Sequence, residues 1–345
     1  MKRLLLLCGT FAFTTMLGAG CSSDRPDDAS EHHATYRAWP SGLVAEPDGS
    51  ALYVAAGARI EKRDAQGSDP VTLADGEPAD PSSSGRGIGA RSLSLHGAHL
   101  YWTRWPLGAD ADSLSSSGPN ILVRTPTRGG AVEVLATSGA APFVRTIVVD
   151  DGVYACSNAA VGESRATLSY VALDGAQAPP RLVSTPLDGQ TCQALFADAS
   201  GVHLSLTTLE AGPRWFDASR TDVRAALQER IEEGVAWASD ALILTRPDGS
   251  QVKLVTGSPR PVFFDGRIAY FKSGIGGGNR GTHLCETGEV SAVSEGQPAR
   301  VIAQSQCSPS AFAVTASRVF WLDDQSLLNE DDSAETVLKS VERAR

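Results

Sequence analysis

Residues 92–103 have the sequence SLSLHGAHLYWT. Apolar residues alternate with small or polar ones on both sides of His96-Gly-Ala98, a pattern typical of two short antiparallel strands joined by a tight turn. The second strand carries the aromatic pair Tyr101-Trp102. Five other segments have the same strand, tight turn and second strand, and that second strand is marked in turn by Tyr53, Tyr154, His203, Tyr270 and Phe320. The sequence is therefore built from repeated β-hairpins.

The six marker residues follow one another at intervals of 48, 53, 49, 67 and 50 residues, and two further short strands fit into most intervals. Four short strands per repeat at a nearly constant interval predict a β-propeller. We therefore expect an all-β fold, with six four-stranded blades in one domain over residues 35–345. The last repeat lacks a fourth strand, and Thr35–Trp39 lies before the first blade. Pairing Thr35–Trp39 with Thr336–Val341 would close the ring and remove an open sheet edge.

Tyr101-Trp102-Thr103 resembles the second-strand motif of YWTD-type propellers, without the Asp that ends it. The other repeats match this family only as aromatic-rich strands. The resemblance therefore implies the propeller architecture and no particular activity, because one fold carries many functions.

The 67-residue interval is long enough to hold an insertion. Ser219–Asp222 could cap a helix, and Val223, Leu227 and Ile231 recur at helical spacing. We expect one short inserted α-helix near residues 217–233. It would either cover exposed sheet or act as a lid or docking helix.

The first 20 residues have the pattern of a secretory signal peptide. Lys2-Arg3 precedes an apolar run from Leu4 to Leu17, and small residues precede Cys21. This start resembles that of bacterial lipoproteins, and the resemblance implies lipidation of Cys21. There are two alternatives. The signal peptide could be cleaved in the ordinary way, which leaves Cys21 as a free thiol, or it could remain uncleaved as an anchor.

Residues 21–34 are polar and lack periodicity, so we expect a flexible tether. Ser22 directly follows Cys21, which by the same resemblance implies an outer-membrane lipoprotein facing the periplasm or the outside. No later run of the sequence is apolar enough to cross a membrane, so the lipid would be the membrane anchor. We expect the protein to be a monomer.

The net charge of −10 and the absence of a basic stripe argue against nucleic acid as a partner. Apart from Cys8 and Cys21, four cysteines remain in a chain expected to be exported, and they predict two disulfides with three possible pairings. Pairing Cys156 with Cys192 and Cys285 with Cys307 is favoured. In both pairs, a cysteine in or beside a loop between second and third strands is joined to one just before the first strand of the next blade, on the same face.

The connections between the second and third strands are long in five of the six repeats, whereas the turns between the first and second strands are all short. In a propeller these two kinds of connection lie on opposite faces. We expect the binding surface on the face with the long loops, since function is concentrated in loops.

Three arginines immediately precede first strands and would ring the mouth of the central channel on that face. Guanidinium groups placed in this way could bind a small anionic ligand, and aromatic residues on neighbouring loops would add contacts. The candidate ligand-binding residues are Arg91, Arg145, Arg260, Trp105 and Trp215. Placement by chance in an arginine-rich chain is the alternative.

No metal or cofactor motif appears in its proper context, and no nucleophile motif is visible. The expected function is therefore that of a non-catalytic binding or scaffold module, with an unknown protein or a small anion as partner. The alternatives are a propeller enzyme of the lactonase, lyase or quinoprotein kind with its site at the channel mouth, and a structural envelope component without a ligand.

Overall fold

The computed structural model describes residues 30–37, 40–56, 59–75, 91–104, 120–139, 141–149, 152–158, 165–173, 179–183, 187–188, 192–198, 201–206, 214–216, 222–225, 229–232, 235–238, 241–256, 262–273, 288–325 and 335–343. Within these residues the regular structure is entirely β-strand. They include no helix with the length and apolar character needed to cross a membrane.

The described strands form seven antiparallel sheets, each made mostly of neighbouring segments. We number six of them blades 1 to 6 in chain order and call the seventh the closing blade. Blade 1 contains β2 (Pro40–Ala45), β3 (Ala51–Ala56), β4 (Arg59–Asp64) and β5 (Val71–Ala74). Blade 2 contains β6 (Arg91–His96), β7 (His99–Arg104), β8 (Ile121–Pro126) and β9 (Glu133–Thr137). Blade 3 contains β10 (Phe143–Val149), β11 (Gly152–Asn158), β12 (Arg165–Ala172), β13 (Arg181–Leu182) and β14 (Leu187–Asp188).

The remaining sheets complete the circle. Blade 4 contains β15 (Cys192–Asp198), β16 (Gly201–Leu206), β17 (Arg214–Phe216) and β18 (Asp222–Ala225). Blade 5 contains β19 (Glu229–Glu232), β20 (Val235–Ala238), β21 (Ala241–Thr245) and β22 (Gln251–Thr256). Blade 6 contains β23 (Val262–Phe264), β24 (Ile268–Ser273), β25 (Glu289–Ser294) and β26 (Arg300–Ala303). The closing blade contains β27 (Pro309–Val314), β28 (Arg318–Asp324), β29 (Thr336–Glu342) and β1 (Glu31–Tyr36).

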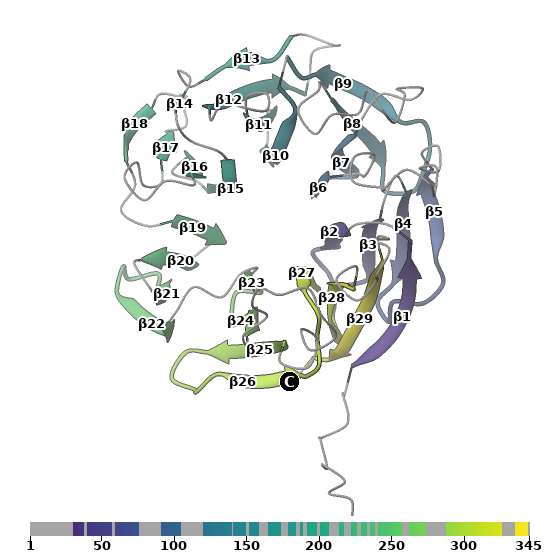
Figure 1. Cartoon of the computed structure of the whole chain (residues 1–345), viewed down its shortest axis with the longest axis vertical. Helices are drawn as coiled ribbons and strands as arrows, with labels where there is room; N and C mark the ends of the chain where they lie inside the picture. Colours follow the sequence, from purple (N-terminus) through teal and green to yellow (C-terminus); the bar gives the residue numbers. More distant parts are fainter. Residues whose placement is uncertain are drawn as a thin grey trace, which may run out of the picture.

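The first strands of the blades line the middle of the ring (Figure 1). Each contacts the first strand of the next blade, in the order β2, β6, β10, β15, β19, β23, β27 and back to β2. The contacts run around the whole circle, so the sheets form a closed β-propeller.

The core lies between neighbouring blades. Tyr53 and Ile60 of blade 1 pack with Trp102 and Val123 of blade 2, and all four are almost completely buried. β3, the second strand of blade 1, is covered on both faces, because all six of its residues are buried, and this explains its unbroken apolar sequence. The aromatic marker residues are thus the side chains that hold one blade against the next.

The prediction of six blades and an inserted helix is wrong. Asp222–Ala225 and Glu229–Glu232, within the expected helix at 217–233, are strands β18 and β19. They end blade 4 and begin blade 5, so the 67-residue interval holds two blades rather than one blade and a helix. Trp237 in β20 is the overlooked marker, 34 residues after His203 and 33 before Tyr270. The local helical spacing was overridden by pairing with neighbouring strands, which is where a β-residue gains its stability.

The expected ring closure is confirmed. β1 pairs with β29 in antiparallel register from Glu31 opposite Ser340 to Tyr36 opposite Thr336. The strand begins at Glu31, so residues 31–34, expected in the tether, belong to the sheet. The closing blade therefore combines three strands from one end of the described chain with one strand from the other (Figure 1).

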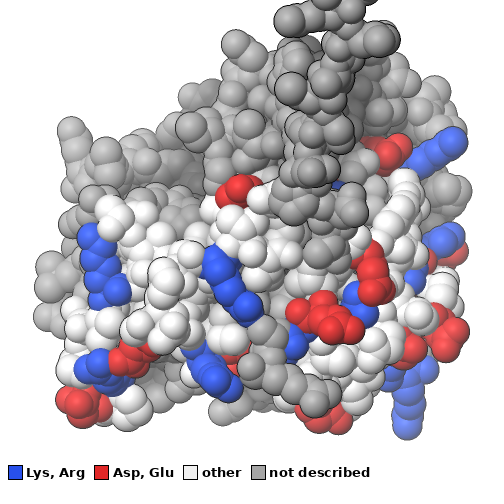
Figure 2. Space-filling model, turned by 90° about the horizontal axis from the view of Figure 1, so that it is seen from below, with Lys and Arg blue, Asp and Glu red and all other residues white. Residues whose placement is uncertain are grey.

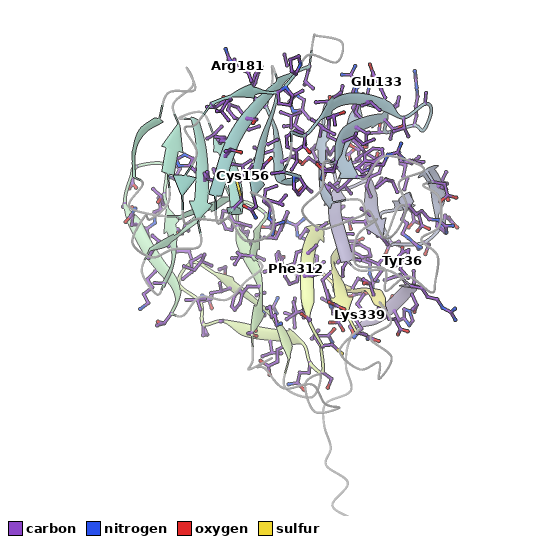
Figure 3. All side chains as sticks on the ribbon, turned by 45° about the horizontal axis from the view of Figure 1, so that its top comes forward. Tyr36, Glu133, Cys156, Arg181, Phe312 and Lys339 are labelled. Atoms are coloured by element: carbon purple, nitrogen blue, oxygen red, sulfur yellow. A yellow bond between two sulfur atoms is a disulfide. The ribbon has the colours of Figure 1, made fainter. Side chains whose placement is uncertain are left out.

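Side chains fasten β1 to both of its neighbours. The Arg318 Nη2 atom lies 2.8 Å from Glu31 Oε2, and His33 Nε2 lies 2.7 Å from Ser340 Oγ. On the blade 1 side, the Tyr36 hydroxyl donates to Glu61 Oε2 at 3.0 Å. Figure 3 shows Tyr36 toward the rim of the ring. These contacts tie the N-terminal strand to the closing blade and to blade 1 at once.

We expect His33 to make the stability of the closing blade depend on pH. Burial and the neighbouring Arg318 charge lower the pKa of His33 below its ordinary value, outweighing the opposite effect of Glu31. The unfolded chain then binds a proton on this imidazole more readily than the folded protein does. Stability should therefore fall as the pH drops through about 6.5 and level off below the folded-state pKa.

The measurement is the thermal midpoint between pH 7.5 and 5 for the native protein and for His33→Gln. The midpoint of the variant should change less over this range. His32→Gln is the matched control, because His32 is the exposed histidine next in sequence. Equal pH dependence in the native protein and His33→Gln would contradict the prediction.

Candidate functional site

The two faces of the ring differ in what lies on them. The short-turn face carries the tight turns that follow first strands, such as 47–50, 265–267 and 315–317. The opposite face, which we call the loop face, is where first strands begin and second strands end. It is the face that the sequence predicts to bind a partner, and its described residues include Arg104, Asn158 and Asp323 at the ends of β7, β11 and β28.

The predicted arginines are only partly described. Arg145 is exposed in β10, near the end at which that strand begins on the loop face, and its Nη1 donates to the Val144 carbonyl at 2.9 Å. Arg91 is the first residue of β6, and Trp215 lies in β17. Arg260, Trp105 and the lipidation candidate Cys21 lie outside the described residues. The ring of three arginines therefore stays a prediction.

The predicted disulfide between Cys156 and Cys192 is confirmed. It joins the second strand of blade 3 to the first strand of blade 4, with the Cα atoms 6.3 Å apart. The Cys192 amide also donates to Asn158 Oδ1 at 2.7 Å. Figure 3 shows Cys156 and its disulfide in the inner part of the ring. Closing a loop of this length stabilises a fold by about 4 kcal/mol in the chain-entropy account.

Cys307 is disulfide-bonded as well. Its predicted partner, Cys285, lies outside the described residues, so that pairing stays a prediction. Cys307 stands just before β27 on the loop face, as Cys192 begins β15.

Two buried donors near the loop-face end of β7 were missed by the sequence reasoning. Arg104 is 9% exposed and Trp102 is 1% exposed. In the described part of the chain, neither Arg104 Nε nor Trp102 Nε1 has a hydrogen-bond partner. The two residues are two positions apart in one strand, so their side chains leave the same face of the sheet. They lie in the interface between blades 1 and 2 to which Trp102 contributes.

A buried guanidinium N–H without a hydrogen-bond partner is costly. Burial alone accounts for the lowered pKa of Arg104, and each buried donor left unpaired costs about 1–3 kcal/mol. An oxyanion that reached Arg104 would accept from its guanidinium and supply a negative charge. The signal in the sequence was Arg104 itself, directly after Tyr101-Trp102-Thr103, because a strand that is otherwise apolar and buried ends on an arginine.

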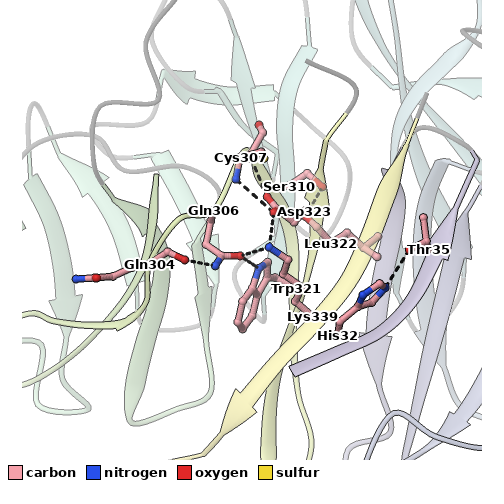
Figure 4. Close-up of polar contacts among 11 residues, drawn as sticks. His32, Thr35, Gln304, Gln306, Cys307, Ser310, Trp321, Leu322, Asp323 and Lys339 are labelled. Carbon is pink, nitrogen blue, oxygen red and sulfur yellow. Dashed lines mark hydrogen bonds and ion pairs between the residues drawn. The ribbon is translucent and has the colours of Figure 1, made fainter. Parts of the chain in front are cut away.

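A second polar cluster occupies the loop-face end of the closing blade (Figure 4). Asp323 is fully buried, and its Oδ2 accepts from Lys339 Nζ at 2.9 Å. Its Oδ1 accepts from the Ser308 amide at 2.7 Å. Lys339 Nζ and Trp321 Nε1 both donate to Gln306 Oε1 at 3.0 Å. This cluster pairs its own charges, so it holds the structure together and offers little to a ligand.

No group of three or more His, Cys, Asp or Glu side chains that could hold a metal ion occurs in the described ranges. On the side of the molecule that Figure 2 shows, basic and acidic side chains are interspersed. The described charged side chains on this side do not gather into a patch of one sign.

Comparison with known proteins identifies the fold and no family. No protein-family model matches the chain, and no curated protein is similar to it in sequence. Among solved structures, YCF48 bound to a D1 peptide aligns with a TM-score of 0.53 and 11% identity, over 90% of this chain and 96% of that one. BamB from Moraxella catarrhalis aligns with a TM-score of 0.43 and 10% identity, over 87% of this chain and 84% of that one.

Puromycin hydrolase aligns with a TM-score of 0.53 and 13% identity, over 83% of this chain and 50% of that one. The chain therefore spans about half the length of puromycin hydrolase. The solved structures similar to this chain thus include an enzyme as well as a propeller with a bound peptide.

Proposed function

We propose that the protein is a non-catalytic β-propeller that binds a segment of another protein on its loop face. Arg104 and Trp102 would bind an oxyanion of the partner, such as a carboxylate. The observation that carries this proposal is the pair of buried donors at the loop-face end of β7 that have no hydrogen-bond partner among the described residues. Unpaired buried polar groups lower stability, and proteins tend to keep such costs at functional sites.

Two further observations support a protein segment as the ligand. The likeness to YCF48 bound to a D1 peptide extends over nearly the whole of both chains. The exposed Arg145 on an inner strand would add a second cationic contact on the same face. Tyr, Trp and Arg side chains are the ones that most often anchor a partner protein.

We further propose an envelope location with a lipid anchor at Cys21. The signal-peptide pattern of residues 1–20 supports export. The disulfide between Cys156 and Cys192 fits an oxidising compartment. Radiolabelled fatty acid should be incorporated into the native protein and not into Cys21→Ala.

The binding proposal is tested by photo-cross-linking in intact cells, with a benzophenone amino acid in place of Arg145 or of Asp48. Asp48 is exposed in the β2–β3 turn on the short-turn face and serves as the control position. We expect an adduct of discrete mass from position 145 only. Equal adducts from both positions would contradict binding on the loop face.

The role of Arg104 is tested by adding Arg104→Met to the cross-linking protein. Loss of a charge-assisted contact should weaken binding about tenfold or more, while thermal stability stays equal or rises because a buried unpaired charge is removed. Arg181→Met is the matched control, since Arg181 lies exposed in the outer strand β13 (Figure 3). An undiminished adduct in Arg104→Met would refute the assignment of Arg104.

A further inference from the structure

The short-turn face has a pocket of about 460 Å³ beside the closing blade. It lies where turns of three sheets meet. Gln66 comes from the turn after β4 in blade 1, Arg267 from the turn between β23 and β24 in blade 6, and Ser317 from the turn between β27 and β28. A cavity of this size is in the range of small-molecule sites.

Hydrogen bonds between blades hold the walls of the pocket in place. The Gln66 amide Nε2 donates to Ser317 Oγ at 2.9 Å, and Thr315 Oγ1 donates to the Ala65 carbonyl at 2.9 Å. The Ala316 amide donates to the Gly49 carbonyl at 3.2 Å. The pocket is therefore formed by the fold before any ligand arrives, which lowers the entropic cost of binding.

Three arginines line this pocket, and two of them are held in position. Arg318 has a side chain that is only 8% exposed, and its Nε donates to Ser340 Oγ at 2.7 Å while Nη2 pairs with Glu31. The Arg343 Nη2 atom lies 2.9 Å from Asp265 Oδ2, and Asp265 is 6% exposed. Fixed guanidinium groups can present their remaining N–H donors in a defined geometry.

The third arginine, Arg267, is exposed, and its side chain has no ion-pair partner among the residues that the structure describes. Glu342 is the one carboxylate among the residues lining the pocket. Arg318 and Arg343 are already paired with Glu31 and Asp265, so among the described lining residues Arg267 is the arginine left to pair with a ligand, and Glu342 is the carboxylate. A ligand with an oxyanion would pair with Arg267, and a hydroxyl or amine on the same ligand could donate to Glu342.

We propose that this closure pocket binds a small hydrophilic molecule that carries a carboxylate or phosphate group together with a hydroxyl or amine donor. Two of the three arginines are on β28 or directly after β29, so the ligand would also hold the closing blade against blade 6. The pocket is on the face opposite to the proposed partner-binding surface and is independent of it.

The test is titration calorimetry of the oxidised protein with galacturonate, citrate and glycerol phosphate, at constant ionic strength set with sodium chloride to remove general screening effects. We expect saturable one-site binding of at least one probe. Binding of galacturonate or citrate alone would identify a carboxylate ligand, and binding of glycerol phosphate alone a phosphate ligand. A concentration of 10 mM is far above the dissociation constants usual for such sites. If none of the three probes binds saturably at this concentration, the proposal is overturned.

Arg267→Gln localises the binding. Loss of its charge should weaken the binding of the responding probe about tenfold or more. Arg246→Gln is the matched control. Arg246 is an exposed arginine of blade 5 that pairs with Glu295 of blade 6, and neither residue lines the pocket. Arg104→Met should leave probe binding unchanged, so failure of this proposal is separable from failure of the one for the loop face. Equal affinities in the native protein and Arg267→Gln would exclude the closure pocket as the site.

Discussion

Removal of β1 is expected to destabilise the folded protein by about 5 kcal/mol or more. Five residue pairs join β1 to β29, and a ladder hydrogen bond contributes about 0.5–1.5 kcal/mol. Without β1, β29 becomes an open edge, and Arg318, 8% exposed, loses the Glu31 carboxylate. Tyr36 would also no longer cover Glu61, which is 5% exposed.

The measurement compares urea unfolding of residues 37–345 with that of residues 30–345, both with their disulfides intact. The longer form keeps the whole strand and controls for loss of the preceding residues. A synthetic peptide of residues 30–37 should restore part of the lost stability to the shorter form, because β1 pairs through its backbone and can bind without a covalent link. Identical unfolding midpoints for the two forms would show that the ring does not depend on this strand.

Asp323→Ala is expected to destabilise the protein by about 3–5 kcal/mol, which corresponds to a decrease of roughly 10 °C in the thermal midpoint. Asp323 is fully buried and accepts from Lys339 and from the amides of Cys307 and Ser308. Alanine leaves the lysine, 11% exposed, without its counter-charge and leaves two backbone donors unpaired. The loss should be greater than that of a surface ion pair, because water cannot replace these contacts.

The double variant Asp323→Leu with Lys339→Met separates charge from packing. Replacing a whole buried ion pair with apolar residues is often neutral, whereas removing one partner is not. We therefore expect the double variant to be more stable than Asp323→Ala. Arg246→Ala, at an exposed pair, should leave the thermal midpoint unchanged. An Asp323→Ala midpoint equal to that of the native protein would mean that the buried pair contributes nothing.

Removal of β1 and Asp323→Ala test different parts of the closing blade. The closing blade is joined by β1 at its outer edge and by the cluster around Asp323 at its loop-face end, while the closure pocket lies at its short-turn end. The disulfide at Cys307 stands beside the Asp323 cluster. A blade assembled from both ends of the described chain thus has a covalent bond and a buried ion pair close together on one face.

Several features of the fold were predictable because their signals are local. Hairpins such as residues 92–103 show alternation and turn residues within a dozen positions. The unpaired last repeat predicted the partner of the N-terminal strand, and the β1–β29 pairing confirms it. The position of Cys156 and Cys192 relative to their strands favoured their disulfide among three possible pairings, and the structure confirms it.

The number of blades was not predictable from the same signals. Blade 5 is short, since its four strands all lie between Glu229 and Thr256, and three of the four residues of its first strand, Glu229–Glu232, are charged. The helical spacing of Val223, Leu227 and Ile231 was therefore the stronger local signal. Only the contacts with adjoining strands decide in favour of a sheet.

The candidate sites divide in the same way. The sequence indicated the loop face through the lengths of its connections, and it placed Arg104 directly after an aromatic-rich strand, yet it did not show that this arginine is buried. Arg104 is distinguished by a buried Nε without a partner in the part of the chain that the structure describes, which depends on how blades 1 and 2 pack. The closure pocket unites residues from Gln66 to Arg343, and no pattern in the sequence relates them.

The sequence by itself determined the all-β repeat and the closure of the ring, and it favoured the pairing of Cys156 with Cys192, because each depends on alternation or spacing along the chain. The tertiary structure decided that the described strands form seven sheets, that Arg104 Nε and Trp102 Nε1 are buried without a hydrogen-bond partner among the described residues, and that three arginines line one pocket. The physical reason is that strand pairing, desolvation and the convergence of turns arise from contacts between residues far apart in the sequence, and local patterns carry no record of those contacts.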